Sequence, residues 1–418
     1  MKNVLIVGGG FAGVYTAKSL LRKSRGKPIH VTLISEHNYF LFTPMLHEIA
    51  TGSISRDNAV TAINQILSDS RFTFIKAHVT SIDTKKKCVE TDTCSRSYDV
   101  LVLATGSSAN YYGVPGASEH TIAIRDLPSA YKIRNKIIAQ IERADVEEDK
   151  KKRDKLLTFM IVGAGATGVE VAGELAQFIR TIITSDHRRI KPQEVKILLV
   201  HRNKEILNML PSYYSQKCAA ELQKLGVTLL LEREIQKVSD GYVVDQHQKK
   251  IEAGTIFWAV GFTPNTVSLD GNKSPVYYVN NFLQVKSDKR SGKLYKDIFA
   301  LGDCAFLDKG DGQRVPMLAQ VAVRQSAVVS NNVLALLGFG SLKEYRFVLE
   351  GFLLSVGDYF AVAGITVFGK TLYFSGFFAW IFWRTLYLTK LIGFGNKVRV
   401  AVDWTLNFFY PRDTSEIE

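Results

Sequence analysis

Residues 6–20 read IVGGGFAGVYTAKSL and residues 161–175 read IVGAGATGVEVAGEL, so two stretches of the chain share one pattern. Each has apolar residues typical of a buried strand, then Gly-x-Gly-x-x-Gly, then Ala and Leu at helical spacing. The first glycine makes a tight turn, the second lets the backbone approach a pyrophosphate, and the third lets the helix pack closely. An ordinary glycine turn would explain one copy, but two copies predict two dinucleotide-binding sites. The glycines are Gly8, Gly10 and Gly13 in the first copy and Gly163, Gly165 and Gly168 in the second.

The composition is that of a globular protein long enough for two or three domains, with 418 residues of which 46% are hydrophobic. The chain has 53 basic and 40 acidic residues, and its net charge of +13 suggests an anionic partner. No nucleic-acid-binding motif accompanies this charge, so we expect no nucleic acid and favour anionic lipid. The four cysteines, Cys88, Cys94, Cys218 and Cys304, form no Cys-x-x-Cys pair. We therefore expect neither a redox disulfide nor a bound metal.

The first predicted βαβ unit runs from Val4 through a helix to a strand that ends at Ser35 and Glu36. The apolar run after Lys2 is too short for an export signal and leads directly into the glycine turn, so it is interpreted as the first strand. Glu36 lies about where an acidic residue meets an adenosine ribose, and Ser35 is the alternative. A later apolar strand ends in an Ala-Thr-Gly turn, formed by Ala104, Thr105 and Gly106.

The second predicted unit ends its second strand in His201 and Arg202, where an acid would be expected. A further strand ends in Ala-Val-Gly at 259–261, so Ala259 and Gly261 repeat the earlier Ala-Thr-Gly turn. The apolar strand at 294–305 then ends in Gly302 and Asp303. Alone, Asp303 would be interpreted as a helix N-cap. After two dinucleotide folds, it is better interpreted as the acid that binds the ribityl hydroxyls of a flavin.

The order of these four motifs resembles that of flavoproteins with two dinucleotide-binding domains, in which the first site holds FAD and the second NADH or NADPH. The resemblance implies an α/β fold with two Rossmann-like domains and a C-terminal membrane-association region. We expect a discontinuous FAD-binding domain at 1–115 and 285–340. We expect an NAD(P)H-binding domain at 116–284 and a membrane-anchoring region at 341–418.

Four segments resemble type II NADH:quinone oxidoreductases: FTPMLHEIATGSI at 42–54, GVEVAGEL at 168–175, AQVAVRQ at 319–325 and the tail at 375–413. The resemblance covers almost the whole chain. It implies hydride transfer from NAD(P)H to FAD and then transfer of two electrons to a membrane quinone, without proton pumping. The protein supplies positioning, exclusion of water and a proton route.

The resemblance also implies roles for individual residues. Glu170 would lie near the nicotinamide and the flavin, although a first-turn acid at a helix N-terminus is stabilising in any case. Gln320 and Arg324 would border the quinone pocket, and Arg324 would either bind the quinone or line its entrance, since the family often has Gln there. Further cofactor contacts fall on motif neighbours, namely Phe11, Ala12, Thr43, Pro44, Thr167, Ala319 and Val321.

Two alternatives remain open at this point. Sulfide:quinone oxidoreductases have a similar architecture but need cysteines flanking the flavin, and only Cys304 adjoins a flavin motif here. The other alternative is a flavoprotein that senses NAD(P)H through a conformational change without turnover. Because His201 and Arg202 replace the expected acid and Arg can bind a phosphate, we expect NADPH to be accepted alongside NADH.

The tail predicts a helix lying in the plane of a membrane. Its longest charge-free stretch, 371–383, has 13 residues, and a spanning helix needs about 20. Apolar residues recur at helical spacing, namely Trp380, Trp383, Leu386, Tyr387 and Leu391. Nearby cations for anionic headgroups are Arg384, Lys390, Lys397 and Arg399. The alternatives are packing on the protein's own core and a homodimer interface. We expect peripheral attachment to the cytoplasmic face of the cell membrane.

Overall fold

The computed structural model describes residues 1–185, 189–288, 292–310 and 312–416. The chain forms two compact units, each built from three segments. Unit 1 consists of Met1–Leu41, Val60–Ser108 and Phe262–Val348, and unit 2 consists of Phe42–Ala59, Ala109–Gly261 and Leu349–Glu418. The domain boundaries expected from the sequence remain predictions.

Unit 1 is built on an eight-stranded sheet in the described part of the chain, with the order β24-β21-β22-β23-β9-β1-β2-β5. These strands are β24 (Ala305–Phe306), β21 (Tyr277–Val279), β22 (Gln284–Lys286), β23 (Leu294–Ala300), β9 (Val100–Leu103), β1 (Lys2–Val7), β2 (Ile29–Ser35) and β5 (Phe72–Lys76). The strands from β23 to β5 pair in parallel. Their near-continuous apolar runs are typical of parallel strands that are buried on both faces.

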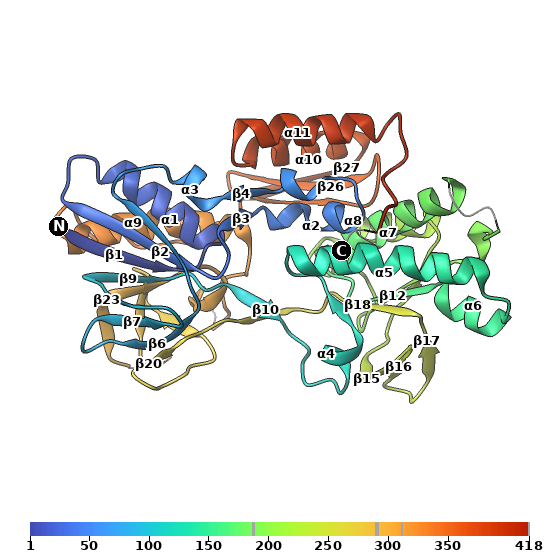
Figure 1. Cartoon of the computed structure of the whole chain (residues 1–418), viewed down its shortest axis with the longest axis horizontal. Helices are drawn as coiled ribbons and strands as arrows, with labels where there is room; N and C mark the ends of the chain where they lie inside the picture. Colours follow the sequence, from blue (N-terminus) through green and yellow to red (C-terminus); the bar gives the residue numbers. More distant parts are fainter. Residues whose placement is uncertain (186–188, 289–291, 311, 417–418) are drawn as a thin grey trace. The chain divides into compact units, whose positions relative to one another are not determined.

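Helices α1 (Phe11–Lys23) and α9 (Ala319–Leu336) pack against each other in unit 1, beside β1 and β2 (Figure 1). The predicted unit β1-α1-β2 is therefore present, with β1 and β2 in parallel register. Smaller elements of this unit are the sheet of β20 (Ser268–Leu269), β6 (Val79–Asp83), β7 (Cys88–Thr91) and β8 (Ser95–Ser97), the pair β3 (Tyr39–Leu41) and β4 (Val60–Ala62), strand β19 (Phe262–Pro264), and helices α3 (Ile63–Ile66) and η4 (Gly302–Cys304).

Unit 2 contains a five-stranded parallel sheet with the order β11-β18-β12-β13-β14. Its strands are β11 (Ile122–Ala123), β18 (Thr255–Trp258), β12 (Thr158–Val162), β13 (Lys196–Val200) and β14 (Val227–Leu230). The helices of this part are α4 (Ala117–His120), α5 (Leu127–Val146), α6 (Lys150–Leu156), α7 (Ala166–Ser185), η3 (Pro192–Glu194) and α8 (Ser212–Lys224). The second predicted unit, β12-α7-β13, is present as well. A small antiparallel sheet adds β15 (Ile235–Ser239), β16 (Tyr242–Asp245) and β17 (Lys250–Glu252), and β10 (Ser107–Ala109) lies at a sequence boundary of the units.

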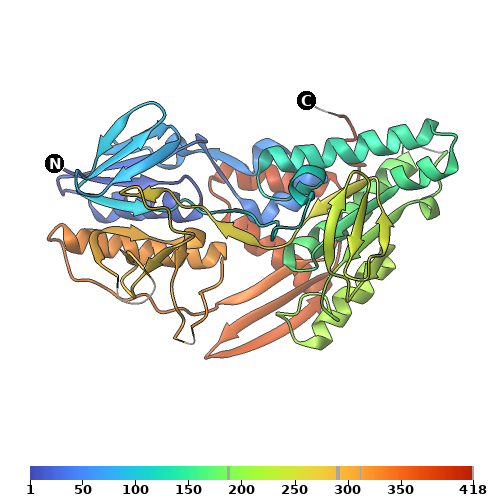
Figure 2. The ribbon, with the colours of Figure 1, turned by 90° about the horizontal axis from the view of Figure 1, so that it is seen from below.

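The C-terminal part of unit 2 is a three-stranded antiparallel sheet with one helix packed on it and a second helix packed against the first (Figure 1). It contains β25 (Gly351–Ser355), β26 (Ala361–Val367), β27 (Lys370–Gly376), α10 (Phe377–Lys390) and α11 (Phe394–Leu406). Figure 2 shows β26 and β27 as a long orange hairpin, and the Tyr214 hydroxyl of α8 donates to the Tyr373 carbonyl of β27 at 2.7 Å. The early segment 42–59, with η1 (Thr43–Met45), α2 (Leu46–Ala50) and η2 (Arg56–Asn58), also belongs to this unit. In the described residues, every helix is too short or too polar to cross a membrane.

Candidate active site

The first glycine turn lies between β1 and α1, and each glycine has its own steric reason. Gly8 has φ of +114°, and a Cβ there would collide with the Ala104 carbonyl. A Cβ on Gly13 would collide with the Gly8 carbonyl, so α1 lies directly against the turn. Gly10 differs, because a Cβ there would meet no protein atom within 4 Å. This space lies at the N-terminus of α1, where backbone N–H groups favour an anion. The turn therefore fits the pyrophosphate of a dinucleotide.

Two further predicted motifs of unit 1, the Ala-Thr-Gly turn and Gly302-Asp303, meet at this turn. The N–H of Ala104 donates to the Val7 carbonyl at 2.8 Å, so the Ala-Thr-Gly turn runs beside the glycine turn. Gly302 has φ of +73°, and a Cβ there would lie 3.1 Å from the Cβ of Ala12. The carboxylate of Asp303 accepts a hydrogen bond from the Ser107 hydroxyl at 2.7 Å. Asp303 is thus fixed beside α1, as a ribityl-binding acid requires.

The start of α9 carries the predicted quinone-site residues and one residue that the sequence analysis missed. Gln320 lies in the first turn with Ala319 and Val321, and Arg324 one turn later. Arg324 donates through Nη1 to the Val348 carbonyl at 3.1 Å, so its guanidinium is anchored to the chain itself. The missed residue is Gln325, which is 2% exposed and accepts from the Gly302 N–H at 2.7 Å. An amide inside an apolar helix face was the signal for it.

Ser35 and Glu36 both lie at the end of β2, where the ribose acid was expected. A Cβ on Gly9 would lie 2.7 Å from the Ser35 hydroxyl, so Ser35 lies directly against the glycine turn. The Glu36 carboxylate is bonded to Nδ1 of His78 at 2.7 Å, and both side chains are mostly exposed. Either side chain fits a role at a ribose.

The second glycine turn repeats this geometry within unit 2. Gly163 has φ of +103° and lies against the Ala259 carbonyl, and a Cβ on Gly168 would collide with the Gly163 carbonyl. A Cβ on Gly165 would again meet nothing within 4 Å. Thr167 follows in the first turn of α7, and Gly261 lies against the hydroxyl of Tyr112. The same arrangement of backbone and open space indicates a second dinucleotide site.

His201 lies at this second turn, at the end of β13. Its Nδ1 accepts a hydrogen bond from the N–H of Ala164 at 3.3 Å, so the ring is neutral on that side. Burial and the neighbouring Arg202 both lower the pKa of His201. Arg202 is exposed, and the nearby Glu205 accepts from the Ser212 hydroxyl at 2.5 Å. The strand therefore ends in His201, whose Nδ1 carries no proton, and in the exposed cation of Arg202, rather than in an acid.

Glu170 lies on α7 in the second helical turn, with 14% of its side chain exposed. Its Oε2 atom is 3.9 Å from Nδ1 of His47, a residue of α2. Burial is the main reason that the pKa of Glu170 is well above its usual value, and Glu48 and Glu174 raise it further. Burial therefore favours the protonated form of this carboxyl more than water does, as a proton donor requires.

A buried polar cluster surrounds this pair, and the sequence analysis did not find it. Its members are His47 and Glu48 of α2, Glu174 of α7, Asp358 before β26, Arg384 of α10 and Arg412 of the tail. Glu174 accepts from Arg412 at 2.9 Å, from Ser53 at 2.9 Å and from Thr51 at 3.2 Å. The signal was present, because three acids and an imidazole occur in the otherwise apolar segments LHEIA and EVAGEL.

Thr43 and Pro44 lie in η1, which belongs to unit 2. Cys304, the cysteine beside Asp303, is fully buried, and its thiol donates to the Leu301 carbonyl at 3.2 Å. Burial raises the pKa of Cys304. A buried thiol of this kind is a packing residue and a poor nucleophile, which disfavours the sulfide-oxidising alternative.

The fold and the paired glycine turns define an oxidoreductase with two dinucleotide-binding domains. In agreement, the family model of the pyridine nucleotide-disulphide oxidoreductases matches residues 2–326, and a model described as the NDH2 C-terminal domain matches residues 350–413. The type II NADH:quinone oxidoreductase Ndh of Mycobacterium tuberculosis is 30% identical over 98% of this chain and 88% of its own length. The chain therefore belongs to the type II NADH:quinone oxidoreductase family.

Two other similar proteins agree with this assignment. The internal alternative NAD(P)H-ubiquinone oxidoreductase A1 of Arabidopsis thaliana is 28% identical over 99% of this chain and 85% of that protein. The structure of NDH2 from Plasmodium falciparum in complex with NADH shares the fold, with a TM-score of 0.87 and 19% identity over 99% of both chains. Family membership confirms the predicted fold class, the enzyme class, FAD and NADH as cofactors, and NADH-to-quinone electron transfer as the reaction.

Proposed function

We propose that this chain oxidises NADH at the second glycine turn and reduces a membrane quinone with FAD held at the first, without pumping protons. FAD supplies the two-electron carrier that links the two substrates. The observation that carries this proposal is the pair of turns, each with open space at its second glycine. NADPH is a second donor in this proposal, because Arg202 replaces the acid that would repel a 2′-phosphate.

Rapid-mixing kinetics with the purified, flavin-containing protein test this function. NADH alone should bleach the flavin absorbance, and a quinone added afterwards should restore it. The rate of steady-state quinone reduction should match the slower of these two half-reactions. A flavin that is reduced by NADH but never reoxidised by any quinone of a panel would refute the assignment and favour a sensing role.

We assign Glu170 to a position near the nicotinamide and the flavin, and Gln320 to the quinone pocket. The raised pKa of the buried Glu170 carboxyl supports the first assignment, since quinone reduction consumes protons. The anchoring of Arg324 to the Val348 carbonyl supports a role at the entrance of the pocket, where it orders the chain around α9. Gln320→Ala should slow reoxidation by quinone and spare reduction by NADH. If the reduction by NADH is slowed instead, the quinone pocket lies elsewhere.

The C-terminal helices support attachment to a lipid surface, but the exposed apolar residues are not those expected from the sequence. Trp380, Trp383 and Leu391 are buried, at 5%, 1% and 4% exposure, because α10 packs on β26 and β27. Arg384 lies in the buried polar cluster and is not available to headgroups. The exposed apolar side chains are instead Phe377, Phe378 and Ile381 of α10 and Phe394, Val398, Val402 and Leu406 of α11.

The four exposed residues of α11 recur every four positions, so they form one apolar row along the helix. Phe378 and Phe394 are 81% and 82% exposed, which is unusual for large apolar side chains and typical of an interaction surface. Lys390 and Arg399 are exposed nearby in the sequence and suit anionic headgroups. Attachment on the cytoplasmic side of the cell membrane is part of this proposal, and a homodimer through the same face is its alternative.

Sedimentation with vesicles tests the lipid surface. Phe378→Ser together with Phe394→Ser should reduce partitioning into anionic vesicles by at least about tenfold, because each phenyl ring contributes roughly 1.5–3 kcal/mol when buried. Tyr213→Ser is the matched control, since Tyr213 is 60% exposed on α8 of the same unit. If the double variant is folded and still sediments as the wild type does, these helices do not attach the protein.

A further inference from the structure

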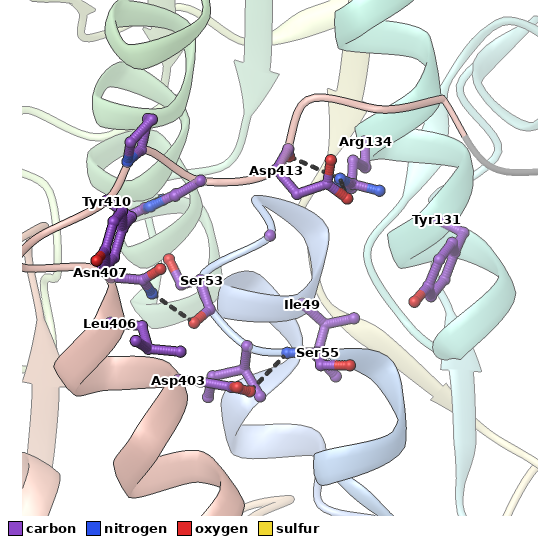
Figure 3. A pocket seen from close by; sticks show the side chains of 14 residues that line it. Ile49, Ser53, Ser55, Tyr131, Arg134, Asp403, Leu406, Asn407, Tyr410 and Asp413 are labelled. Atoms are coloured by element: carbon purple, nitrogen blue, oxygen red, sulfur yellow. Dashed lines mark hydrogen bonds and ion pairs between the residues drawn. The ribbon is translucent and has the colours of Figure 1, made fainter.

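A pocket of about 370 Å³ opens within unit 2, between the loop after α2, helix α5, helix α11 and the C-terminal tail (Figure 3). Its wall is held together by polar contacts. Asn407 donates to the Ser53 carbonyl at 2.7 Å, Asp403 accepts from the Ser55 N–H at 3.0 Å, and Arg134 donates to the Asp413 carbonyl at 2.7 Å. Tyr410 in this wall is 66% exposed, so the pocket is in contact with solvent.

Two side chains of the pocket wall also bind the buried carboxylate of Glu174. The Ser53 hydroxyl and Nη1 of Arg412 each donate to its Oε2 atom at 2.9 Å. Glu174 is itself 4% exposed. It therefore lies one hydrogen bond behind the wall of a pocket that opens to the surface.

From Glu174, polar groups continue inward to Glu170. The Thr51 hydroxyl donates to the Glu174 carboxylate at 3.2 Å and to the His47 carbonyl at 3.1 Å, so it ties Glu174 to α2. The Glu174 side chain is also close enough to the His47 ring that its charge counters the lowering of the His47 pKa by burial. On the other side, Nδ1 of His47 is 3.9 Å from Oε2 of Glu170, a gap that a small rotation of the ring would close. Glu170 and Glu174 are one turn apart on the same face of α7.

Two atoms along this line are buried and make no hydrogen bond with the described residues. They are Nε2 of His47 and Oε2 of Glu48. Polar atoms of this kind cost about 1–3 kcal/mol each when left unsatisfied. This cost is explained if Nε2 of His47 and Oε2 of Glu48 exchange protons during the reaction.

Charged groups of α2, α7, α10, the segment before β26 and the C-terminal tail surround the residues between Glu174 and Glu170. Burial and Glu174 raise the pKa of Glu48 to about 8, so its carboxyl exchanges its proton near neutral pH. Burial lowers the pKa of His47 to about 4, so the ring is neutral, with one ring nitrogen protonated and the other able to accept a proton. Burial would raise the pKa of Glu174, but Arg412, His47, Ser53 and Arg384 together lower it. Asp358 faces both arginines, at 3.7 Å from Arg384 and 3.8 Å from Arg412.

We propose that this pocket is the entrance of a proton-supply route that runs from Glu174 through His47 and Glu48 to Glu170. The stoichiometry requires such a supply. NADH gives up a hydride, which is two electrons and one proton, whereas a quinone takes two electrons and two protons to become a quinol. One proton per turnover therefore comes from water. This inference rests on the proposed function and adds the path by which that proton reaches Glu170.

Glu174→Gln tests the entrance of the route. Reoxidation of the flavin by quinone should slow at least about tenfold above neutral pH, while reduction by NADH keeps its wild-type rate. A small weak acid such as formate, added in the millimolar range, should restore part of the lost rate, since it carries protons through the pocket. Asp413→Asn is the control, because Asp413 lies in the same wall and contacts Arg134 instead of Glu174.

Infrared spectroscopy gives a readout that does not depend on turnover. In deuterated buffer, the carbonyl band of the protonated buried carboxyls should shift rapidly in the wild type and at least about tenfold more slowly in Glu174→Gln. Because Glu174→Gln removes the anion that pairs with the buried Arg412, Ser53→Ala serves as a second, milder variant with the same expected direction. Unchanged exchange and unchanged reoxidation in either folded variant would overturn the route. A wild type that reduces no quinone would instead overturn the proposed function.

Discussion

Gly10→Ala should remove FAD without destabilising the protein itself. A Cβ on Gly10 meets no protein atom within 4 Å, and the residue is the N-cap of α1 with φ of −86° and ψ of −163°, which alanine also adopts. Alanine restricts the unfolded chain and stabilises by about 0.4–1 kcal/mol. It is a poorer N-cap than glycine by a similar amount. The two effects cancel, so the free energy of unfolding of the FAD-free protein should change by less than about 0.5 kcal/mol.

The added methyl group occupies the space where the pyrophosphate approaches the backbone. We expect at least about a tenfold loss of FAD affinity, or ~1.4 kcal/mol. Gly13→Ala should behave in the opposite way, because its Cβ collides with the Gly8 carbonyl and forces α1 away from β1. Overpacking of this kind costs about 1–3 kcal/mol. At roughly 2–4 °C per kcal/mol, Tm should fall by roughly 2–12 °C with or without FAD.

The assay combines flavin content after dialysis with thermal unfolding of the FAD-free proteins. Gly165→Ala is the matched control, since its Cβ also meets nothing within 4 Å but lies in the second turn. It should weaken NADH binding and leave the flavin content unchanged. The reasoning is refuted if Gly10→Ala retains flavin as the wild type does, or if its FAD-free form loses as much stability as Gly13→Ala.

Three further predictions follow from the site. Asp303→Ala should lose the flavin during purification. A variant with full flavin content would show that Asp303 does not bind the flavin and only accepts the hydrogen bond from Ser107. Arg202→Glu should lower kcat/KM for NADPH by at least about tenfold, or ~1.4 kcal/mol, and spare NADH, measured at low ionic strength; a wild type that ignores NADPH contradicts this. His47 has a folded pKa of about 4 against an ordinary 6.5, so the unfolded chain binds its proton first and stability is lost as pH falls through that window. His47→Asn should therefore flatten the acid limb of urea unfolding between these pH values, and an unchanged slope would show that His47 is not buried in its neutral form.

Local patterns predicted the two glycine turns because the relevant physics is local. A tight turn, a close approach and a helix start are all set by residues within one βαβ unit, so the spacing of three glycines carries the information. The position of Asp303 beside Ala12 followed only from the family's order of motifs, since nearly 300 residues separate them. The buried cluster was not predicted for the same reason. Glu174 and Arg412 are 238 residues apart, and nothing in either segment indicates that the other neutralises it.

In the tail, the apolar spacing predicted the helix correctly but assigned the wrong side of that helix to the membrane. Apolar residues at a spacing of three or four predict a helix with an apolar side, but they do not say what covers that side. Trp380 and Trp383 lie at such positions and are buried, because the hairpin β26–β27 supplies a protein surface that the sequence analysis did not include. The Arg384 side chain is largely buried as well, and its guanidinium lies 4.0 Å from the centre of the Trp380 ring and pairs with Asp358. For the proposed attachment to lipid, the cations that remain on the two helices are Lys390, Lys397 and Arg399. Because these cations are few, the proposed attachment should depend more on the exposed phenylalanines than on salt, and the serine variants should weaken it more than added salt does.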